Sequence, residues 1–519
     1  MTTPDNLKVL FLSPEVVPFA KTGGLADVAG ALPFALSSLG AEVRLVLPLY
    51  RTIREGDFQT RSFIDDIEIP LGNNTLKAAI KESRLNDGIP VYLIEREDLY
   101  DRPNLYGNAS GDYYDNLERF SFYAHAALRL MRSISFSPDI IHCHDWQTGL
   151  IPALLKGPYR YNRLLSETPT VFTIHNLGYQ GIFPSEKLPV TGLPKDDFFH
   201  LEGAEFWGNI SLLKTGIMYS EAVTTVSPSY AAEILTHEFG MGMEGVLKRR
   251  KEAIYGILNG IDYDIWSPEK DRHLPAAYSA KEMVGKARCK AALIQETGLD
   301  PAVSKKPLLG MITRLDTQKG LDLLVHILDD LMALDLGLVV LGSGDEGISR
   351  AIQEAVDRYP GRINLTKGFN EPLAHRIMAG TDIFLIPSRY EPCGLTQMYA
   401  LKYGTVPIVR ATGGLKDTIV QFNVKTCEGN GFRFGPYKPD SFLRAVRAAT
   451  KLFNNAETWQ RLISNGMKAD FSWDRSAGSY MNLYESLVKK SKNSHSIVTP
   501  KVDDGKRIHG LQPNSAHRR

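Results

Sequence analysis

Two copies of one short sequence, Thr-Gly-Gly-Leu, lie near opposite ends of the chain, at residues 22–25 and 412–415. A pair of glycines lets backbone N–H groups approach a ligand without a Cβ atom in the way. The helix expected after each turn presents its N-terminus, which favours negative charge. Such a turn can bind a phosphate or a sugar, or it can serve strand-to-helix packing alone. Lys21 and Asp27 flank the first copy and favour binding.

The segment TRLDTQKGLD, residues 313–322, places two cations close together in the chain. Arg314 follows a predicted strand, and Lys319 directly precedes Gly320. Both could converge on one diphosphate at the edge of a sheet. Two unit charges about 4 Å apart interact by roughly 4 kcal/mol at an effective dielectric constant of about 20. The pair would therefore assist departure of a nucleoside diphosphate, unless it forms a solvated turn with Asp316 and Asp322.

A third segment, SRYEPCGLTQMYALKYG at residues 388–404, brings a carboxylate to the end of a predicted strand. Glu391 could hold sugar hydroxyls or stabilise a cationic sugar carbon. Alternatively, it is only an acidic residue favoured by the dipole of the next helix. That helix would begin around residues 393–396 and offer free N–H groups and a hydroxyl to a ligand. The contributing residues are Cys393, Gly394, Leu395 and Thr396.

Two further segments end strands in the N-terminal half, HCHDWQT at 142–148 and FTIHNLGYQGIF at 172–183. The histidines at 142 and 144 with Asp145 could be read as a metal cluster. Adjacent histidines at strand ends more often form hydrogen bonds, and no third ligand set at useful spacing is evident. The Asp-x-Asp sequence at 262–264 follows Asn259-Gly260, which favours a turn over a metal site. We therefore expect no metal.

The positions of these segments depend on strands that alternate with helices. In the first half, strands are predicted at 7–13, 43–47, 91–94, 140–142, 170–174 and 222–226, with helices at 24–39 and 118–131. A proline-punctuated stretch at 267–279 marks a domain boundary. The pattern restarts with strands at 308–312, 338–341, 363–366, 383–386 and 406–409, and helices at 322–334 and 348–357.

This alternation predicts an α/β protein with two Rossmann-like, doubly wound domains that face a deep cleft. Ligands of such sheets bind beyond the carboxyl ends of the strands, so both glycine turns are expected to line the cleft. The predicted domains are 1–265, which binds the acceptor, and 266–470, which binds the nucleotide sugar. Residues 489–519, rich in Ser, Lys, His and Asn, are predicted to be a disordered tail.

Composition excludes several classes of protein. A chain of 519 residues with 43% hydrophobic residues has no apolar run long enough to cross a bilayer. A formal charge of +1 gives no global field for nucleic acid or a membrane surface. No nucleophile elbow or Walker A sequence occurs, and GSGDEG at 342–347 favours a tight turn over a dinucleotide site because its acids would repel pyrophosphate. Four dispersed cysteines and the absence of a leader favour the cytoplasm.

Seven motifs occur in a characteristic order between about residues 7 and 488: KTGGLADV, HDWQT, HNLGYQGIF, NGID, TRLDTQKG, EPCGLTQMYALKYG and TGGLKDT. In this order they resemble bacterial glycogen synthases and the related starch synthases. The resemblance implies a retaining glycosyltransferase of the glycosyltransferase-B fold. Such an enzyme moves glucose from ADP-glucose to the non-reducing 4-hydroxyl of an α-1,4-glucan such as glycogen, without metal or pyridoxal phosphate. It also implies that residues 471–488 form a helix that crosses back to the N-terminal domain.

The resemblance also assigns roles to residues at matching positions. Those expected to act on the diphosphate and glucose are Lys21, His175, Arg314, Lys319 and Glu391. Those expected to bind the substrates are Gly23, Gly24, Asp27, Tyr106, Asp145, Asn176, Asn259, Cys393, Gly394, Leu395 and Thr396. Tyr106 is preferred over Tyr100 as the tyrosine that stacks on the base. Related transferases carry a second glutamate where this chain has Tyr399, which leaves the ribose contact unassigned.

Three alternatives stay open at this stage. The same enzyme type could use UDP-glucose, because no residue here reads adenine against uracil. A glucan phosphorylase would have the same fold but would need pyridoxal phosphate on a lysine. A non-catalytic protein that binds a sugar nucleotide or a glucan is a third possibility, although it would not need Lys21, Arg314, Lys319 and Glu391 together.

Overall fold

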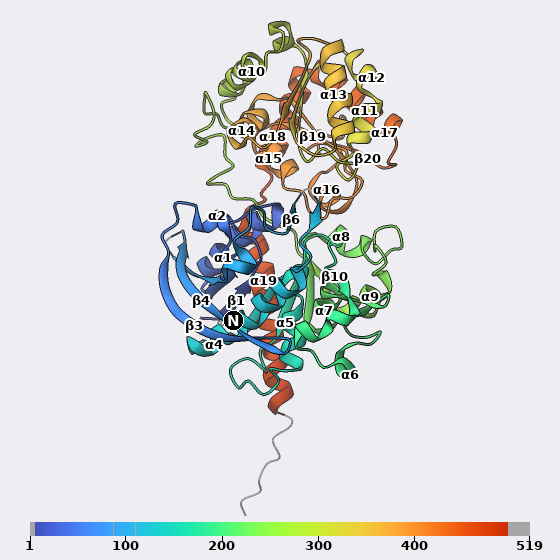
Figure 1. Ribbon diagram of the computed structural model, residues 1–519. Helices are drawn as coiled ribbons and strands as arrows, with labels where there is room; N and C mark the ends of the chain where they lie inside the picture. Colours follow the sequence, from blue (N-terminus) through green and yellow to red (C-terminus); the bar gives the residue numbers. More distant parts are fainter. Residues whose placement is uncertain (1–5, 87, 109, 497–519) are drawn as a thin grey trace, which may run out of the picture.

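The computed structural model describes residues 6–86, 88–108 and 110–496 and has two α/β domains, one above the other in Figure 1. In the first sheet the strands lie in the order β14-β13-β9-β8-β1-β2-β5-β4-β3. Neighbours from β14 to β5 run parallel, as predicted. These strands are β1 Lys8–Leu12, β2 Glu42–Pro48, β5 Ile89–Glu95, β8 Ile140–His144, β9 Thr170–Ile174, β13 Ala222–Thr225 and β14 Ile254–Gly256.

One edge of this sheet differs from the predicted parallel arrangement. Strands β3 (Arg61–Leu71) and β4 (Asn74–Leu85) pair antiparallel with each other, and β4 pairs antiparallel with β5. Most side chains of β3 are exposed, so the strand lacks the apolar run by which the buried strands can be recognised. An antiparallel edge can leave one face in water. No strand was therefore predicted between residues 47 and 91.

The second sheet has the order β17-β16-β15-β18-β19-β20, with every neighbour pair parallel. In both sheets the chain leaves a central strand, builds outward on one side and then returns to the other side of that strand. The reversal lies between β1 and β8 in the first sheet and between β15 and β18 in the second. These strands are β15 Leu308–Ile312, β16 Gly337–Gly342, β17 Ile363–Lys367, β18 Ile383–Ile386, β19 Val406–Arg410 and β20 Phe432–Phe434.

Helices cover both sheets. The first domain has α1 Gly24–Ser38, α2 Arg51–Arg54, α3 Glu97–Tyr100, α4 Asn116–Ser133, α5 Leu150–Lys156, α6 Lys195–Phe198, α7 Leu212–Tyr219, α8 Pro228–Glu233 and α9 Glu244–Arg249. The second has α10 Val284–Thr297, α11 Leu321–His326, α12 Leu328–Met332, α13 Glu346–Arg358, α14 Glu371–Gly380, α15 Thr396–Lys402, α16 Gly413–Thr418, α17 Pro439–Phe453 and α18 Ala456–Lys468. The helix predicted at 322–334 is interrupted at Ile327, where α11 ends and α12 begins.

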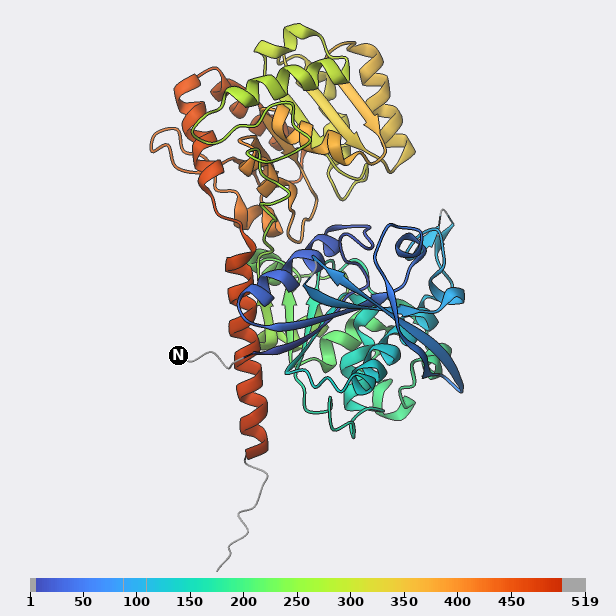
Figure 2. The ribbon, with the colours of Figure 1, turned by 90° about the vertical axis from the view of Figure 1, so that its left-hand side faces the viewer.

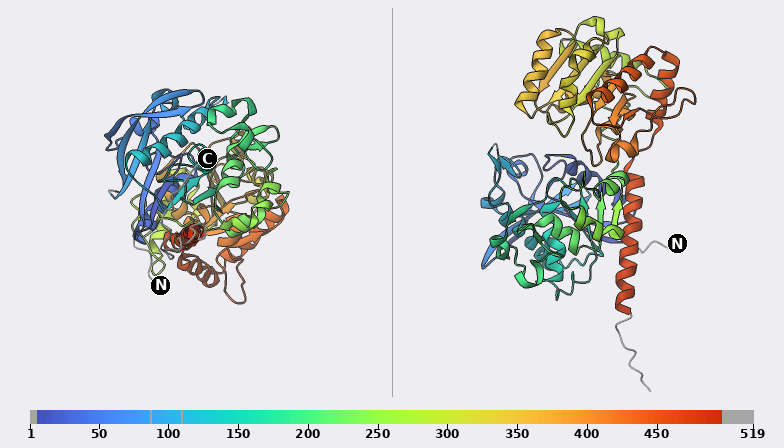
Figure 3. Two further views of the ribbon diagram at one scale, coloured as in Figure 1. Left: turned by 90° about the horizontal axis from the view of Figure 1, so that it is seen from below. Right: turned by 90° about the vertical axis from the view of Figure 1, so that its right-hand side faces the viewer.

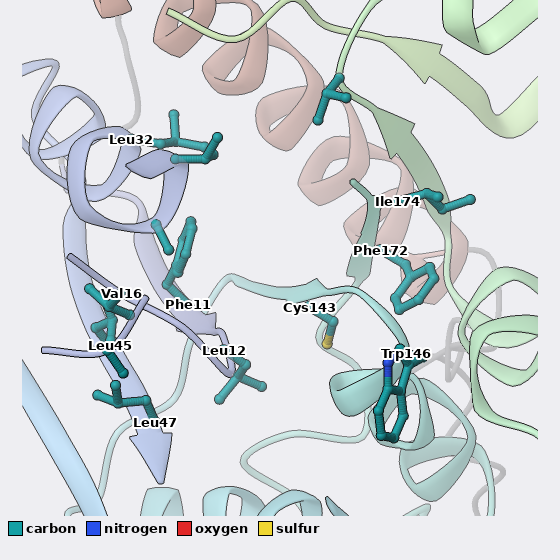
Figure 4. Packing of buried hydrophobic residues seen from close by; sticks show 14 of the residues in the cluster. Phe11, Leu12, Val16, Leu32, Leu45, Leu47, Cys143, Trp146, Phe172 and Ile174 are labelled. Carbon is teal, nitrogen blue, oxygen red and sulfur yellow. The ribbon is translucent and has the colours of Figure 1, made fainter. Parts of the chain in front are cut away.

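The buried apolar residues of the first domain form one continuous cluster, which also includes residues of the second domain. Figure 4 shows Phe11 of β1, Leu45 of β2 and Phe172 of β9 pointing into this core, and each is fully buried. Leu32 of α1, also fully buried, lies above β1 in the same view. The loops that leave these strands therefore start from a rigid base.

The last helix, α19 (Trp473–Ser496), leaves the second domain and runs along the first (Figure 2). Its N-terminal region meets the segment that leaves the first domain: the N–H of Ile261 donates to the Phe471 carbonyl at 2.8 Å. Further along, the Tyr484 hydroxyl lies 2.8 Å from His142 Nδ1. Figure 3 shows the same helix from the opposite side.

The helix continues to Ser496, so residues 489–496, which were predicted to belong to a disordered tail, are helical. Few apolar residues occur after 488, and the sequence therefore suggested that the helix ended there. The remainder of that prediction, residues 497–519, lies outside the described residues.

A small sheet projects from the first domain, in the order β10-β12-β11. Its strands are β10 Ile182–Pro184, β11 Glu205–Phe206 and β12 Asn209–Ser211, and a further two-stranded pair joins β6 Gly107–Asn108 to β7 Gly111–Asp112. In the part of the chain that the structure describes, no helix is long and apolar enough to cross a membrane.

Candidate active site

One cleft, with a volume of about 680 Å³, lies between the two domains. Its walls include the loops that follow β1 and β8 from the first sheet and β15 and β18 from the second, which are the strands at the two reversal points. The lining includes every predicted site residue: Lys21, Gly23, Gly24, Asp27, Tyr106, Asp145, His175, Asn176, Asn259, Arg314, Lys319, Glu391, Cys393, Gly394, Leu395 and Thr396. The carboxyl ends of parallel strands thus bring together residues from both halves of the chain.

The centre of the second domain's wall is a buried ion pair. Lys319 Nζ donates to both Glu391 oxygens at 2.8 Å. The Ser388 hydroxyl donates to Glu391 Oε2, also at 2.8 Å. The Glu391 residue is only 7% exposed. An ion pair at this depth is weakly screened by solvent, and hydrogen bonds fix its geometry.

Arg314 lies on the same wall and is more exposed. Its guanidinium contacts Gln318 Oε1 at 3.0 Å and Asp316 Oδ2 at 3.3 Å. The other Asp316 oxygen accepts the backbone N–H of Lys319 at 2.9 Å. Asp316 therefore shapes the turn between the two cations, as expected for the alternative of a basic turn. Asp322, the other acid of that alternative, pairs with Arg389 instead. Because about half of the Arg314 side chain is exposed, the guanidinium can reorient toward an anion in the cleft.

The first glycine turn is held by an acid that the sequence analysis missed. Glu15 accepts hydrogen bonds from the backbone N–H and hydroxyl of Thr22, both at 2.6 Å, and from the N–H of Gly23 at 3.2 Å. It also accepts the Tyr106 hydroxyl at 2.8 Å. A Cβ added to Gly23 would meet nothing within 4 Å, so this glycine borders open space in the cleft.

The start of α1 carries an ion pair of its own. Lys21 Nζ lies 2.7 Å from Asp27 Oδ1. Burial raises the pKa of Asp27, and Lys21 opposes this increase. The side chain of Lys21 is 44% exposed, so its ammonium group can also reach a ligand. The N-terminus of α1 and Lys21 therefore present positive charge from the first domain.

The loops after β8 and β9 form a neutral polar surface. Asp145 Oδ1 accepts the backbone N–H of His175 at 2.7 Å, and His175 Nε2 lies 2.9 Å from His144 Nδ1. Burial lowers the pKa of His175 to about 3 and raises the pKa of Asp145 to about 7. At neutral pH the His175 ring is therefore uncharged and suited to hydrogen bonding with sugar hydroxyls. Asn176 Oδ1 accepts the Gly178 N–H at 2.9 Å, and the residue lines the cleft.

The segment before α15 turns sharply at Gly394, which has a φ of +69°. The side chain of Gln397 donates to the carbonyls of Cys393 and Gly394 at 3.1 and 2.8 Å, so these carbonyls point back into the protein. Burial raises the pKa of the Cys393 thiol to about 12, so the group is not a thiolate. Asn259 is 5% exposed, and its Oδ1 has no hydrogen-bond partner among the described residues. This oxygen is a ready acceptor at the cleft.

The second glycine turn does not line the cleft, contrary to the prediction. The N–H of Gly413 and the hydroxyl of Thr412 instead donate to the Glu233 carboxylate at 2.9 and 3.1 Å. A Cβ on Gly413 would lie 1.9 Å from the Glu391 carbonyl oxygen. The turn therefore packs under the cleft segment and joins it to α8 of the first domain. Each glycine turn is hydrogen-bonded to a glutamate side chain, but only the first turn lines the cleft.

The two possible metal motifs have other contacts. His142 Nε2 lies 2.6 Å from the Thr173 hydroxyl, and the Asp262 carboxylate accepts the Asp264 N–H at 2.8 Å, as in the predicted turn. Within the described ranges, no group of three or more His, Cys, Asp or Glu residues is arranged to hold a metal ion.

Several residues that line the cleft were not predicted. Phe369, in the loop between β17 and α14, is 83% exposed. Tyr399 is stacked against Trp266 with ring centroids 3.9 Å apart, and Trp266 also stacks on His375 at 3.9 Å. Phe369 follows the strand predicted at 363–366 by three residues, and this position could have indicated that its ring lies near the cleft. No signal in the sequence joins Trp266 to Tyr399.

Comparisons with known proteins agree with this arrangement. Residues 8–249 match a family described as the starch synthase catalytic domain, and residues 300–469 match the glycosyl transferases group 1 family. A glycogen synthase of Anaeromyxobacter sp. strain Fw109-5 is 46% identical over 483 residues, covering 93% of this chain and all of the relative. A glycogen synthase of Geobacillus stearothermophilus is 43% identical and covers 95% of this chain and all of the relative.

A solved structure is also similar over nearly the full length. The catalytic domain of starch synthase IV from Arabidopsis thaliana, bound to ADP and acarbose, is 34% identical and superposes with a TM-score of 0.86. The match covers 94% of this chain and all of that domain.

Proposed function

Because this chain belongs to the family of glycogen and starch synthases, we propose that it transfers glucose from ADP-glucose to the non-reducing 4-hydroxyl of an α-1,4-glucan, with retention of configuration. Family membership establishes a glucosyltransferase of the glycosyltransferase-B fold that uses a sugar nucleotide and a glucan. The identity of the donor, the stereochemistry and the roles of individual residues form the proposal.

The contact between Lys319 and Glu391 carries this proposal. A lysine ammonium has three donors, and Glu391 takes two of them. The third can bind a phosphate oxygen, so Lys319 can link the carboxylate beside the sugar to the leaving group. Arg314 adds a second cation from the same wall, and Lys21 adds a third from the opposite domain. Charge stabilisation of the departing diphosphate would be the main contribution of the protein.

The proposed reaction is a front-face displacement. The bond between C1 of glucose and the diphosphate oxygen breaks, and its electron pair goes to that oxygen. The acceptor 4-hydroxyl forms the new bond to C1 from the same face, and its proton goes to the leaving phosphate oxygen. His175 and Asn176 would hold sugar hydroxyls from the first domain. Exclusion of water from the cleft would prevent hydrolysis of the donor.

One comparison favours ADP as the nucleotide. The starch synthase IV domain, with which this chain shares 34% of its residues, is bound to ADP. For the base of either nucleotide the cleft presents two rings, that of Tyr106, the residue preferred for stacking from the sequence, and the exposed ring of Phe369. Stacking of a planar base on an aromatic ring is worth about 1–3 kcal/mol. Stacking alone does not select adenine, so the donor requires a direct test.

We propose that no metal ion and no pyridoxal phosphate take part, since three cationic side chains are available to balance the charge of the leaving group. The four free thiols, at residues 143, 289, 393 and 427, support a reducing cytosol as the compartment.

A side-by-side assay tests the function. Product release is measured with ADP-glucose and with UDP-glucose, each with and without glycogen. We expect release of ADP that requires glycogen, with at least about tenfold lower kcat/KM for UDP-glucose, a difference of about 1.4 kcal/mol. Equal or greater use of UDP-glucose would refute the assignment of the donor. Release that does not need glycogen would refute the transferase.

A further inference from the structure

Trp207 occupies an unusual position at the tip of the hairpin formed by β11 and β12. Phe206 pairs with Asn209, so Trp207 and Gly208 form a two-residue loop. Both have positive φ, +52° and +78°. Two positive φ values define the turn that favours Asn-Gly, and a bulky residue at the first position is strained.

Burial does not compensate this strain. Trp207 is 81% exposed. Its closest aromatic contact is an edge-on one with Phe206 at a centroid distance of 6.2 Å. An indole kept in water on a strained backbone indicates a function for its ring.

A chain of contacts joins this ring to the rim of the cleft. Tyr179 lines the cleft and is about half exposed. The next residue, Gln180, donates from its side chain to the Met241 carbonyl at 3.0 Å. A Cβ placed on the adjacent Gly242 would lie 4.0 Å from Trp207 Nε1. The turn at 241–242 therefore lies between the cleft loop and the indole.

We infer that Trp207 binds a distal segment of the acceptor α-glucan, whose non-reducing end lies in the cleft. This inference rests on the proposed function and extends it to a second contact on the same polymer. Glucose units present C–H groups on their faces, which pack on an aromatic ring while the hydroxyls stay hydrated. A long glucan that leaves the cleft at Tyr179 would pass over the 241–242 turn to reach the indole.

The surroundings of the ring favour a sugar chain over a protein partner. Protein interfaces use contiguous apolar patches. Next to Trp207 in the hairpin are the buried Phe206, Gly208 and the polar residues Glu205 and Asn209, and the Gly208 N–H donates to Glu205 Oε1 at 2.7 Å. A single exposed ring with polar neighbours suits a hydrated polysaccharide.

The experiment compares Trp207→Asn with the wild-type protein. This variant creates Asn-Gly, the sequence that the turn prefers, so the fold should be at least as stable. Initial rates are measured with ADP-glucose and either glycogen or maltotriose, an acceptor of only three glucose units. We expect about a fivefold increase in KM for glycogen, consistent with exposure of one ring face. The turnover and the KM for maltotriose should not change.

Two further variants sharpen the result. Trp207→Phe retains a ring and should restore part of the glycogen affinity. Tyr161→Ala removes a ring that is equally exposed, at 81%, but is not part of the cleft lining, and should leave all parameters unchanged.

Affinity electrophoresis in gels containing glycogen separates this inference from the proposed function, because it requires no turnover. Loss of retardation in Trp207→Asn alone would support the inference even if the donor proved to be different. Equal retardation of the variant and the wild type would overturn it, as would equal changes with maltotriose. If Trp207→Asn changed the molecular mass of the protein in solution but left its glycogen affinity unchanged, the ring would belong to a contact between subunits instead.

Discussion

Lys319 Nζ lies 2.8 Å from both carboxylate oxygens of Glu391, across the base of the cleft. The two residues are 72 positions apart and follow different strands of the second sheet. This contact joins the group proposed to bind the leaving phosphate to the group proposed to bind glucose. Each can be tested separately.

Replacement of Lys319 or Arg314 by alanine should reduce turnover by at least about tenfold each, a loss of about 1.4 kcal/mol of transition-state stabilisation. The reason is loss of a positive charge beside the departing diphosphate. Steady-state kinetics with ADP-glucose and glycogen provides the measurement. Lys305→Ala is a matched control, since Lys305 is not among the cleft-lining residues. Near-native rates in both cleft variants would remove these residues from the diphosphate site.

Glu391→Gln should lower kcat by at least about a hundredfold, the scale seen when a preorganised electrostatic group is removed. The amide keeps the shape of the side chain but cannot balance Lys319 or a positive sugar carbon. Ser388→Ala removes only one hydrogen bond to Glu391 and should cost about tenfold or less. If Ser388→Ala impaired turnover as strongly as Glu391→Gln, the carboxylate charge would not be the decisive feature.

Glu233→Ala should destabilise the contact between the domains. The substitution leaves the Gly413 N–H and the Thr412 hydroxyl without their acceptor, at a cost of about 1–3 kcal/mol. Glu233→Gln keeps one acceptor oxygen and should cost less. Urea unfolding measures the difference. An unfolding midpoint for Glu233→Ala equal to that of the wild type would show that the contact does not contribute to stability.

The depressed pKa of His175 predicts a pH dependence of stability. Burial lowers this pKa from 6.5 to about 3, so the folded state keeps the ring neutral while the unfolded state binds a proton below pH 6.5. The His175 contribution is therefore fully present above pH 6.5 and is lost as the pH falls toward 3. His175→Gln should reduce the slope of unfolding free energy in this window by up to about 1.4 kcal/mol per pH unit. Identical slopes for variant and wild type between pH 4 and 6 would contradict the neutral, buried ring.

The strands that build the cleft could be predicted because they are short apolar runs bounded by turn residues. The predictions for 308–312 and 383–386 coincide with β15 and β18. Strands β3 and β4 were missed, since an edge pair with a solvated face carries no such run. The prediction of a continuous helix at 322–334 was wrong because periodicity does not reveal the break at Ile327.

Many of the cleft-lining residues could also be predicted, because the topology of a doubly wound sheet collects strand ends at one place. The contacts within it could not. Glu15 with Thr22 and Glu233 with Gly413 are seven and 180 positions apart, and neither spacing has a periodic signature. The wrong prediction that the second glycine turn lines the cleft has the same cause. Its sequence is identical to that of the first turn, but its glutamate partner comes from the other domain.

The most direct test of the proposed diphosphate site is a crystal structure of the protein with ADP. We expect the phosphate oxygens to lie about 3 Å from Lys319 Nζ and within hydrogen-bond distance of the Arg314 guanidinium, close to Glu391. ADP bound elsewhere, with both cations still paired to Glu391 and Asp316 alone, would contradict it.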